Sequence, residues 1–353
     1  MTRSTGRNAV WIVLAAMLML GGRPAFSDEP LPSINLPFED WTIIAYAKGF
    51  LQEAYSRIGT TDVHLVDPGT MQLSGTEAAL LDRGGLALAQ RMMYPAAIHK
   101  ANGIDASIVW LSERSNPERT PVLALADSPI QNVADLKGKV LGSSRVSCGW
   151  TSPTEVLEVA GTPLDTPARH GAVRFTNIMN TVATNNALLS GRIDATSTHI
   201  AIAENAALWT SGQVKVIGRS PADGVYVNDA GRVSYFAMRE FAARHPLAIQ
   251  AFLLTRLRTE AWAKANTEEA IHLIATGKRV PVEIARFGLL DPSSFSFLGG
   301  EPSAAAAIAA VKEFQAWYLA HGDEILADHH LTDAQIDAFV DRRFFQGGDY
   351  SVY

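Results

Sequence analysis

The segment DSPIQNVADLKGKVLGSS, residues 127–144, indicates more about the fold than any other part of this chain. Its pattern predicts a short helix over Val133–Leu136, a glycine turn, a buried strand over Lys139–Leu141 and a loop that opens with Gly142. The next segment, SPTEVLE (152–158), is typical of a helix start. A strand that ends in small residues before a helix presents unpaired N–H groups and the positive end of the helix dipole. The sequence therefore predicts an anion site here.

The first 27 residues have the composition of a secretory signal peptide. Two arginines precede an apolar run over 9–20, and Ala25 and Ser27 supply small residues at a cleavage site. The run is shorter than the roughly 20 residues that span a bilayer. We expect residues 1–27 to be removed and the rest of the chain to be exported to the periplasm. A retained N-terminal anchor is the alternative.

The charge balance argues against nucleic acid as a partner. The chain has 30 basic and 36 acidic residues, and three of the arginines lie within 1–27, which leaves 27 basic against 36 acidic residues, a formal charge of −9. Nucleic-acid binding requires a clustered basic patch. Cys148 is the single cysteine, so an internal disulfide framework is excluded. The histidines lack metal-ligand spacing, and we expect neither a metal nor a cofactor.

Short apolar runs alternate with helical patterns along the chain, which is the signature of an α/β fold. Strands are predicted over 33–36, 63–66, 86–89, 106–110, 139–141, 214–217 and 233–237, and helices over 43–57, 76–82, 94–101, 181–189, 201–209, 246–266, 267–277, 281–287, 303–321 and 332–345. Polar linkers occupy 115–121 and 220–224. We therefore expect a discontinuous first lobe, 28–124 plus 221–353, with a helical C-terminal tail. The second lobe is 125–220, and a cleft separates the two.

Four motifs carry a family resemblance: AKGF (47–50), ADLKGK (134–139), ALLSGRIDA (187–195) and YFAMREFA (235–242). In this order the chain resembles the periplasmic solute-binding proteins of nitrate, sulfonate and taurine ABC importers, which share a fold with thiamine-pyrimidine proteins. The resemblance implies a two-lobed type II periplasmic binding protein fold, with two α/β domains joined by a two-strand hinge. It also implies a monomer that captures a small organic anion between its lobes and delivers it to an ABC permease in the inner membrane.

The stretch 69–85 is similar to the aryl-sulfinate desulfinases, enzymes that share the two-lobed fold. That family uses a nucleophilic cysteine, an assisting histidine and an arginine. The matching positions here hold Leu36 and Gln72, and Arg83 lies one place out of register. Leucine forms no thiolate, and an amide takes up no proton near neutral pH. We therefore predict a binding protein without catalytic residues; an enzyme that uses Cys148, or a sensor-type binding protein, is the alternative.

In this fold the ligand contacts come from loops at strand ends that face the cleft. The candidate contacts of the second lobe are Ser143, Ser144, Arg145, Cys148, Trp150 and His199. The serine hydroxyls suit sulfonate, nitrate or carboxylate oxygens, and Arg145 can form a charge-assisted pair. In the alternative interpretation the serines only cap a helix and Arg145 is exposed. Cys148 is interpreted as a small pocket-lining residue, and Trp150 as a ring that stacks on the ligand or seals the lobe.

The candidate contacts of the first lobe are Phe38, Trp41, Thr70, Gln72, Arg91 and Tyr94. Trp41 is expected to pack on an organic ligand or to begin the core of a helix. Arg91 is a second candidate for an anion contact, with a solvated arginine as the alternative. Glu39 and Asp40 are interpreted as charges that stabilise a helix start. The alternative for these two acids is a contact with a cationic group such as an amine.

Overall fold

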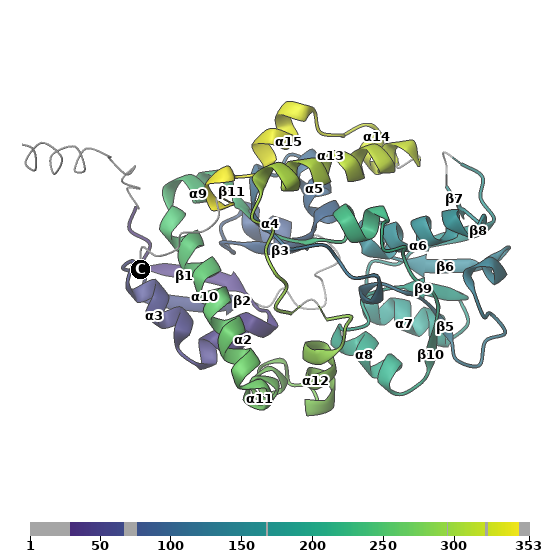
Figure 1. Cartoon of the computed structure of the whole chain (residues 1–353), viewed down its shortest axis with the longest axis horizontal. Helices are drawn as coiled ribbons and strands as arrows, with labels where there is room; N and C mark the ends of the chain where they lie inside the picture. Colours follow the sequence, from purple (N-terminus) through teal and green to yellow (C-terminus); the bar gives the residue numbers. More distant parts are fainter. Residues whose placement is uncertain (1–28, 67–75, 167–168, 295, 322–323, 346–353) are drawn as a thin grey trace, which may run out of the picture.

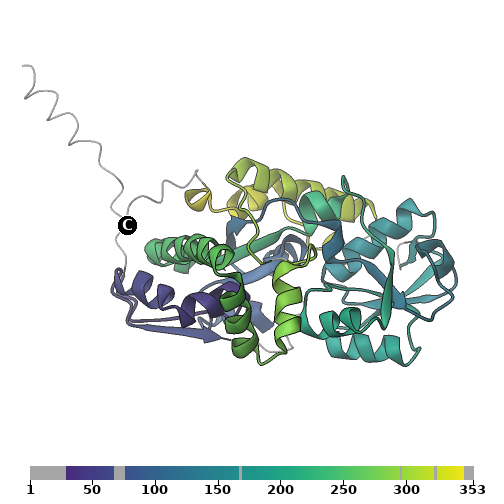
Figure 2. The same ribbon diagram turned by 60° about the horizontal axis from the view of Figure 1, so that its bottom comes forward.

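The computed structural model describes residues 29–66, 76–166, 169–294, 296–321 and 324–345. The predicted signal peptide and the candidate contacts Thr70 and Gln72 lie outside these described residues. The described chain forms two α/β lobes that lie next to each other (Figure 1). The first lobe carries the purple, green and yellow elements and part of the blue ones, and the second lobe carries the teal elements and the rest of the blue ones. Figure 2 shows the same division from another side.

The second lobe is built on one six-stranded sheet with the order β10-β5-β9-β6-β8-β7. Its strands are β5 (Val122–Leu125), β6 (Val140–Ser143), β7 (Leu164–Asp165), β8 (Val173–Asn177), β9 (Ala195–Ser197) and β10 (Val214–Gly218). Its helices are η3 (Val133–Leu136), α6 (Cys148–Val159), α7 (Thr181–Leu189) and α8 (Ala203–Thr210). Strand β6 is parallel to β8 and β9, and each of the three leads into a helix. The N-termini of these helices therefore gather at one edge of the sheet, where ligands bind in α/β folds.

The described part of the first lobe contains two small sheets. Strand β1 (Ser33–Pro37) is parallel to β2 (Asp62–Val66), and β11 (Val233–Met238) lies between β3 (Ala89–Met92) and β4 (Ala106–Leu111), antiparallel to both. The N-terminal helices are α2 (Asp40–Ala47), α3 (Phe50–Ser56), α4 (Thr76–Asp82) and α5 (Met93–Ala101). The chain crosses between the lobes twice, from β4 through η2 (Pro117–Arg119) to β5, and from β10 through η4 (Tyr226–Ala230) to β11.

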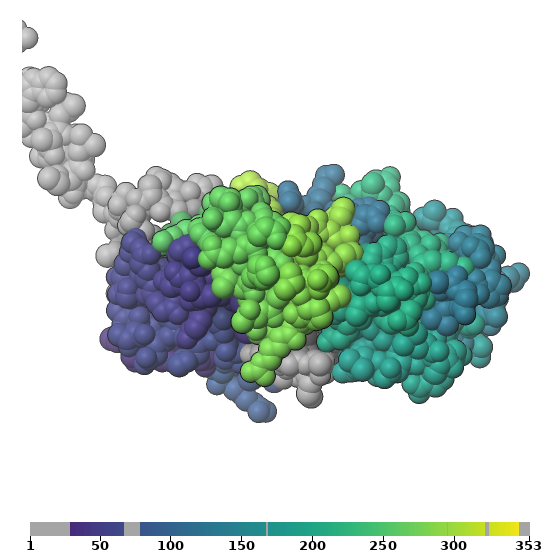
Figure 3. Space-filling model, turned by 90° about the horizontal axis from the view of Figure 1, so that it is seen from below, coloured from purple at the N-terminus to yellow at the C-terminus, as the bar shows by residue number. Residues whose placement is uncertain are grey.

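The C-terminal part of the described chain is helical. It comprises α9 (Arg239–Arg244), α10 (Pro246–Ala265), α11 (Thr267–Lys278), α12 (Val282–Leu290), α13 (Ala304–Ala320), α14 (Glu324–Ala327), α15 (Asp333–Phe339) and η5 (Arg342–Phe344). Helix α12 touches the second lobe, where Phe287 packs on the core around Ile200 and a Cβ at Gly288 would lie 3.4 Å from the carbonyl oxygen of Ala201. Figure 3, seen from below, shows this green segment against the teal lobe.

Two predicted helices end differently from the expectation. The helix expected over 43–57 is divided into α2 and α3, because Gly49 between them adopts a φ of 74°, which only glycine tolerates without strain. The helix expected over 332–345 ends at Phe339, since Val340 leaves it to form a parallel bridge with Ile108 of β4. In both cases a single residue ends the helix, Gly49 through its positive φ and Val340 through its bridge to Ile108. The apolar spacing of a helix indicates neither of these features.

Two further differences bear on the site. The strand expected over 86–89 was wrong, because pairing with β11 places β3 at Ala89–Met92 and puts Arg91 within the strand. The helix expected from Ser152 begins at Cys148 instead, where Ser147 provides the N-cap. Pro153 is therefore an interior residue of α6, although proline usually marks a first turn.

Candidate functional site

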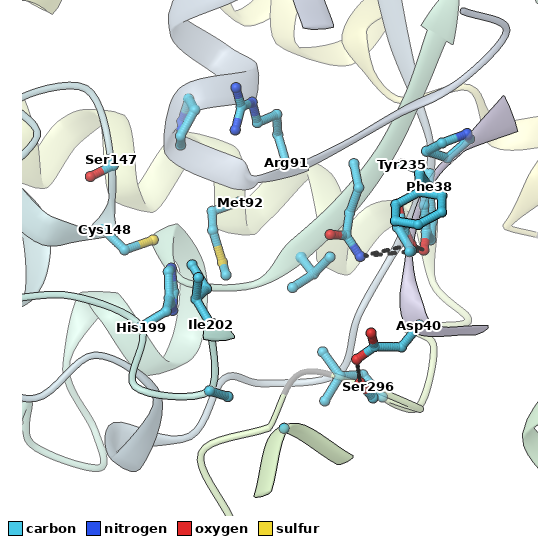
Figure 4. Close-up of a pocket in the computed structure, with 18 of the residues that line it drawn as sticks. Phe38, Asp40, Arg91, Met92, Ser147, Cys148, His199, Ile202, Tyr235 and Ser296 are labelled. Carbon is cyan, nitrogen blue, oxygen red and sulfur yellow. Dashed lines mark hydrogen bonds between the residues drawn. The ribbon is translucent and has the colours of Figure 1, made fainter. Parts of the chain in front are cut away.

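A cavity of about 590 Å³ lies between the two lobes. Its first-lobe side is lined by the β1–α2 connection, β3, β11, α10 and the segment 296–298, and its second-lobe side by the starts of α6 and α7 and the segment 199–204. Figure 4 shows Ser147, Cys148, His199 and Ile202 on one side and Phe38, Asp40, Tyr235 and Ser296 on the other. A cavity at the junction of two lobes is the preferred position for a small ligand.

Two helix N-termini of the second lobe open onto this cavity. Ser147 caps α6, since its Oγ accepts a hydrogen bond from the N–H of Gly149 at 3.1 Å, and Ser147 and Cys148 both line the cavity. Asn180 caps α7 in the same way, and Thr181 lines the cavity. The first turn of a helix presents N–H groups without intrahelical partners and carries a partial positive charge. This wall therefore favours a negatively charged group.

A second, much smaller pocket adjoins the cavity, with which it shares Ser147, Thr181, His199 and Ile202. Its volume is about 20 Å³, enough for a single water molecule. Ser143 and Ser144 line this pocket and not the main cavity. The hydroxyl of Ser143 donates to the carbonyl oxygen of Ser197 at 2.6 Å, and Ser144 Oγ lies 3.7 Å from the sulfur of Met179. The two serines predicted as anion contacts thus lie in a polar recess behind the cavity wall.

Cys148 and His199 face the second-lobe end of the cavity (Figure 4). Burial raises the pKa of the Cys148 thiol to about 12. Burial, with a smaller contribution from Arg119, lowers the pKa of His199 to about 4. Thr120 Oγ1 lies 3.0 Å from His199 Nδ1 and 2.7 Å from the hydroxyl of Tyr226. At neutral pH the two groups are a thiol and a neutral imidazole, whereas a nucleophilic cysteine requires a thiolate.

The opposite wall is organised around the carboxyl group of Glu39. Its Oε2 accepts hydrogen bonds from Trp41 Nε1 at 3.0 Å, from Gln90 Nε2 at 3.2 Å and from the hydroxyl of Tyr235. Its Oε1 is buried and accepts no hydrogen bond from any residue that the structure describes. At the start of α2, Glu39 and Thr42 form a capping box, in which the backbone N–H of Glu39 donates to Thr42 Oγ1 at 2.8 Å. Burial raises the pKa of Glu39 to about 7, so near neutral pH the group is divided between its two protonation states.

The neighbouring acid, Asp40, is held by two contacts with other parts of the first lobe. It forms an ion pair with Lys278 of α11, and its Oδ2 accepts a hydrogen bond from Ser296 Oγ at 2.9 Å. Asp40 lies in the first turn of α2, where a negative charge is favourable. The expectation that both acids belong to the helix start agrees with their positions, since Glu39 is the N-cap residue of α2 and Asp40 lies in its first turn. The Glu39 carboxyl group also takes part in a buried cluster.

Arg91, Arg256 and Lys278 are basic side chains that line the first-lobe side. Arg256 donates to the carbonyl oxygen of Leu298 at 2.6 Å, and its guanidinium lies 4.2 Å from the centre of the Trp110 ring. Arg91 comes from β3 and, as a guanidinium, stays charged at every relevant pH. Arg91 is therefore the predicted anion contact that the structure places in the first-lobe wall.

The aromatic candidates of the first lobe, Phe38 and Trp41, also line the cavity. Trp41 is nevertheless almost completely buried, and its ring packs edge-on against Phe252 of α10 with centroids 4.7 Å apart. The indole therefore belongs to the lobe core, as one of the two interpretations expected, and it also lines the cavity.

Three candidates, Tyr94, Arg145 and Trp150, lie away from the cavity. Together with Tyr318 they form what we call the inter-lobe stack. The guanidinium of Arg145 lies 3.9 Å from the Trp150 ring centre and donates to the Tyr94 hydroxyl at 3.1 Å. Tyr318 of α13 stacks on Tyr94 at 4.1 Å and on Trp150 at 5.2 Å. Because α6 begins at Cys148, Trp150 is a buried helical residue and not a loop residue. The expected ligand contacts of Arg145, Trp150 and Tyr94 are thus replaced by contacts between the lobes.

Four further residues line the cavity that were not predicted as contacts from the sequence: Ser147, Gln90, Tyr235 and Arg256. A signal existed for Ser147, because serine is a preferred N-cap residue and a helix start at Cys148 would have identified it. Tyr235 belonged to a family motif, but nothing local indicates that its hydroxyl reaches Glu39. Arg256 lies within a long helix, where its sequence neighbours give no sign of a cavity.

Within the described ranges, no group of three or more His, Cys, Asp and Glu side chains is placed to hold a metal ion. None of the helices in the described part of the chain is both long and apolar enough to cross a membrane.

Fold and cavity together define the class of protein: this is a two-lobed type II periplasmic binding protein fold with a ligand-sized cavity between its α/β lobes. The model of the NMT1/THI5-like family matches residues 44–270, and the chain belongs to this family. The fold class and the family relationship predicted from the sequence are confirmed.

Relatives of known structure or name agree with this assignment. The putative aliphatic sulfonates-binding protein of Escherichia coli (strain K12) is 24% identical over 285 residues, which cover 79% of this chain and 82% of that protein. The alkanesulfonate-binding protein SsuA from Xanthomonas axonopodis pv. citri, solved bound to MOPS, gives a TM-score of 0.71 at 16% identity, covering 89% of this chain and 99% of that one. A DSZB mutant solved with biphenyl-2-sulfinic acid gives 0.57 at 14% identity, covering 91% and 98%. The structural likenesses show the shared fold.

Proposed function

We propose that this protein is the periplasmic substrate-binding component of an ABC importer. It captures a small organic anion of the sulfonate class in the inter-lobe cavity and delivers it to a permease in the inner membrane. Residues 1–27 are its signal peptide, 28–124 plus 221–353 its first lobe and 125–220 its second. The sulfonate-binding names of the Escherichia coli relative and the Xanthomonas structure support this proposal.

The proposal rests mainly on one observation: two helix N-termini and an arginine line the same cavity. The starts of α6 and α7 come from the second lobe, and Arg91 comes from the first. Each helix N-terminus stabilises an anion by about 0.3–1 kcal/mol, and by up to about 2 kcal/mol where water is partly excluded. A sulfonate held by Ser147, Thr181 and Arg91 contacts both lobes, so its binding favours the closed arrangement.

The rest of the cavity suits the organic part of such a ligand. Phe38, Trp41 and Ile202 supply apolar surface, with Cys148 and His199 as uncharged neighbours. Nitrate would leave most of a cavity of about 590 Å³ unfilled, which favours a ligand with a carbon chain or ring.

The test is a thermal-shift and calorimetric screen of the chain from Asp28 onward against alkanesulfonates, nitrate and an alkylcarboxylate. At a hundredfold excess over Kd a ligand raises the free energy of unfolding by about 2.7 kcal/mol. We expect saturable one-to-one binding of at least one sulfonate, weakened in Arg91→Gln. Uptake of that sulfonate by cells should fall when the gene is deleted. Absence of binding to every sulfonate would contradict the proposal, and normal uptake after deletion would favour a sensor role.

A second candidate function is an enzyme, because the DSZB mutant with a sulfinic acid shares the fold. This candidate requires a reactive Cys148, and a thiol whose pKa is raised to about 12 is poorly suited to attack. Incubation with an aryl sulfinate separates the two. Sulfite release that disappears in Cys148→Ser supports the enzyme, whereas stoichiometric binding that survives this substitution supports the binding protein.

A further inference from the structure

A buried arginine, Arg119, lies on the first crossing between the lobes, where it is the last residue of η2. The residue is 3% exposed, and burial lowers its pKa, yet a guanidinium stays charged at neutral pH. Its Nη1 donates one long hydrogen bond, of 3.4 Å, to Ser115 Oγ, and its Nε has no partner among the described residues. Arg119 is therefore a buried charge without the partners that such a charge usually requires.

The other buried arginines of the described chain are better compensated. Arg232 forms an ion pair with Glu301 at 3.0 Å. Arg145 and Arg256 each lie over a tryptophan ring, and each donates a hydrogen bond of 3.1 Å or less to an oxygen atom. Arg119 has neither an ion pair nor an aromatic ring beside it within the described ranges. Its charge is therefore compensated less than that of any other buried arginine in this part of the chain.

The ionisable groups that face Arg119 do not neutralise it. Tyr226, Cys148 and His199 are all within reach of its charge. Burial raises the pKa of Tyr226 above its usual value, raises that of Cys148 to about 12 and lowers that of His199 to about 4. All three are therefore uncharged at neutral pH. An acid, Glu113, also attracts Arg119, but it is exposed, and water weakens an interaction with an exposed charge.

Arg119 lies directly behind the second-lobe wall of the cavity. Its carbonyl oxygen accepts a hydrogen bond from the N–H of Ile200 at 3.4 Å, and Oγ1 of the next residue, Thr120, lies 3.0 Å from His199 Nδ1. The charge of Arg119 also lowers the pKa of His199 and of Cys148, both of which line the cavity (Figure 4). Cys148 is the first residue of α6, whose N-terminus favours an anion. Arg119 and the dipole of α6 therefore favour negative charge at the same end of the cavity.

We infer that the positive charge of Arg119 stabilises the anionic group of a ligand at the second-lobe end of the cavity without touching it, and that this anion supplies the negative charge that Arg119 lacks in the empty protein. The inference rests on the proposed function, because it needs an anion in the cavity. Arg119 does not line the cavity, so the interaction acts through the wall. Between unit charges about 10 Å apart, at an effective dielectric constant of about 20, the attraction changes a dissociation constant roughly tenfold.

The test compares Arg119→Met with the wild type, because methionine fills much of the same space without a charge. The probes are ethanesulfonate, butane-1-sulfonate and benzenesulfonate, and calorimetry measures their affinities. We expect the Kd of each sulfonate that binds to rise about tenfold in Arg119→Met. The urea midpoint of the empty variant should not fall below that of the wild type, since replacing an uncompensated buried charge by an apolar side chain is neutral or stabilising. The pKa of His199, followed by NMR, should rise in the variant, because the charge of Arg119 lowers it.

Two control variants assign the effect to the charge. Arg119→Lys keeps the charge and should keep most of the affinity, whereas Arg232→Met removes a compensated buried arginine and should lower stability without weakening binding. If Arg119→Met fails to fold, Arg119→Gln replaces it in the same measurements.

The outcomes separate the inference from the proposed function. Unchanged sulfonate affinity in Arg119→Met would overturn the inference and leave the proposed function standing. An equal loss of affinity in Arg119→Lys would also overturn it, because the effect would then come from packing and not from charge. Failure of all three sulfonates to bind the wild type would contradict the proposed function and the inference with it.

Discussion

Gly149 is the position where the smallest substitution should have the largest effect on the cavity wall. A Cβ at this residue would lie 2.0 Å from Ser143 Oγ and 2.8 Å from the carbonyl oxygen of Ser197. The Ser143 hydroxyl can rotate, but it then gives up its 2.6 Å hydrogen bond to that same carbonyl. The carbonyl belongs to β9 and cannot move away without disturbing the sheet. The first turn of α6 must therefore shift away from the strand ends.

The expected loss can be worked out from these contacts. Overpacking of a buried contact costs about 1–3 kcal/mol, and the lost hydrogen bond adds about 0.5–1.5 kcal/mol. We expect Gly149→Ala to lower the free energy of unfolding by about 2–4 kcal/mol in urea titrations. Displacement of the α6 N-terminus should also weaken sulfonate binding, and a loss of about 1 kcal/mol corresponds to about a fivefold rise in Kd.

Two controls make the test specific. Ser143→Ala combined with Gly149→Ala removes the 2.0 Å contact but keeps the 2.8 Å one, so the double variant should recover only about 1 kcal/mol of stability. Gly288→Ala lies in α12, where the new Cβ meets Ala201 at an ordinary 3.4 Å, and should be neutral or stabilise by up to about 1 kcal/mol. A Gly149→Ala variant with wild-type stability and affinity would refute the close packing of α6 on β6 and β9.

Further predictions concern other parts of the site. Trp150→Ala removes the centre of the inter-lobe stack and should cost about 3–5 kcal/mol of stability, measured by urea unfolding; a loss below 1 kcal/mol would contradict its burial. Cys148 in the native protein should react with a thiol reagent far more slowly than in the unfolded chain, because burial raises its pKa to about 12, and equal rates would argue against this. Burial lowers the pKa of His99 to about 4 from about 6.5 in the unfolded chain, so the unfolded state binds more protons between these values. His99→Phe should therefore gain stability relative to the wild type as pH falls from 6.5 to 4, and a constant difference would show that His99 titrates normally. Tyr235→Phe removes a hydrogen bond that lowers the pKa of Glu39, so the midpoint of the Glu39 titration, followed by NMR of its carboxyl carbon, should move above pH 7; an unchanged midpoint would contradict this bond.

Local sequence patterns were sufficient to predict much of the fold. The helices over 76–82 and 181–189 and the short turn over 133–136 have the predicted bounds, because apolar spacing and capping residues act within a few residues of one another. A helix start after β6 was also predicted, although its N-cap is Ser147 and not a residue near 152. Proline at 153 suggested the later start, since its usual place is the first turn.

The polar cluster could not be predicted in the same way. Gln90 is 51 residues and Tyr235 is 196 residues from Glu39, and only the packing of β3 and β11 beside the β1–α2 connection brings them together. The sequence neighbours of Glu39 therefore indicated only an acid that stabilises a helix start. Trp150 likewise stacks on Tyr318 of the C-terminal helix α13, and no local sequence motif predicts this contact.

The inter-lobe stack also bears on where a ligand of the proposed kind would enter the cavity. Tyr318 ties the lobes together through α13, which lies along the opposite edge of the molecule from α12 and α8 (Figure 1). Because the stack joins the two lobes along one edge, we expect the cavity to open at the other edge. There Phe287 packs on the second lobe and Gly288 lies against Ala201. We therefore expect α12, a helix of 9 residues, to separate from the second lobe when a ligand enters or leaves.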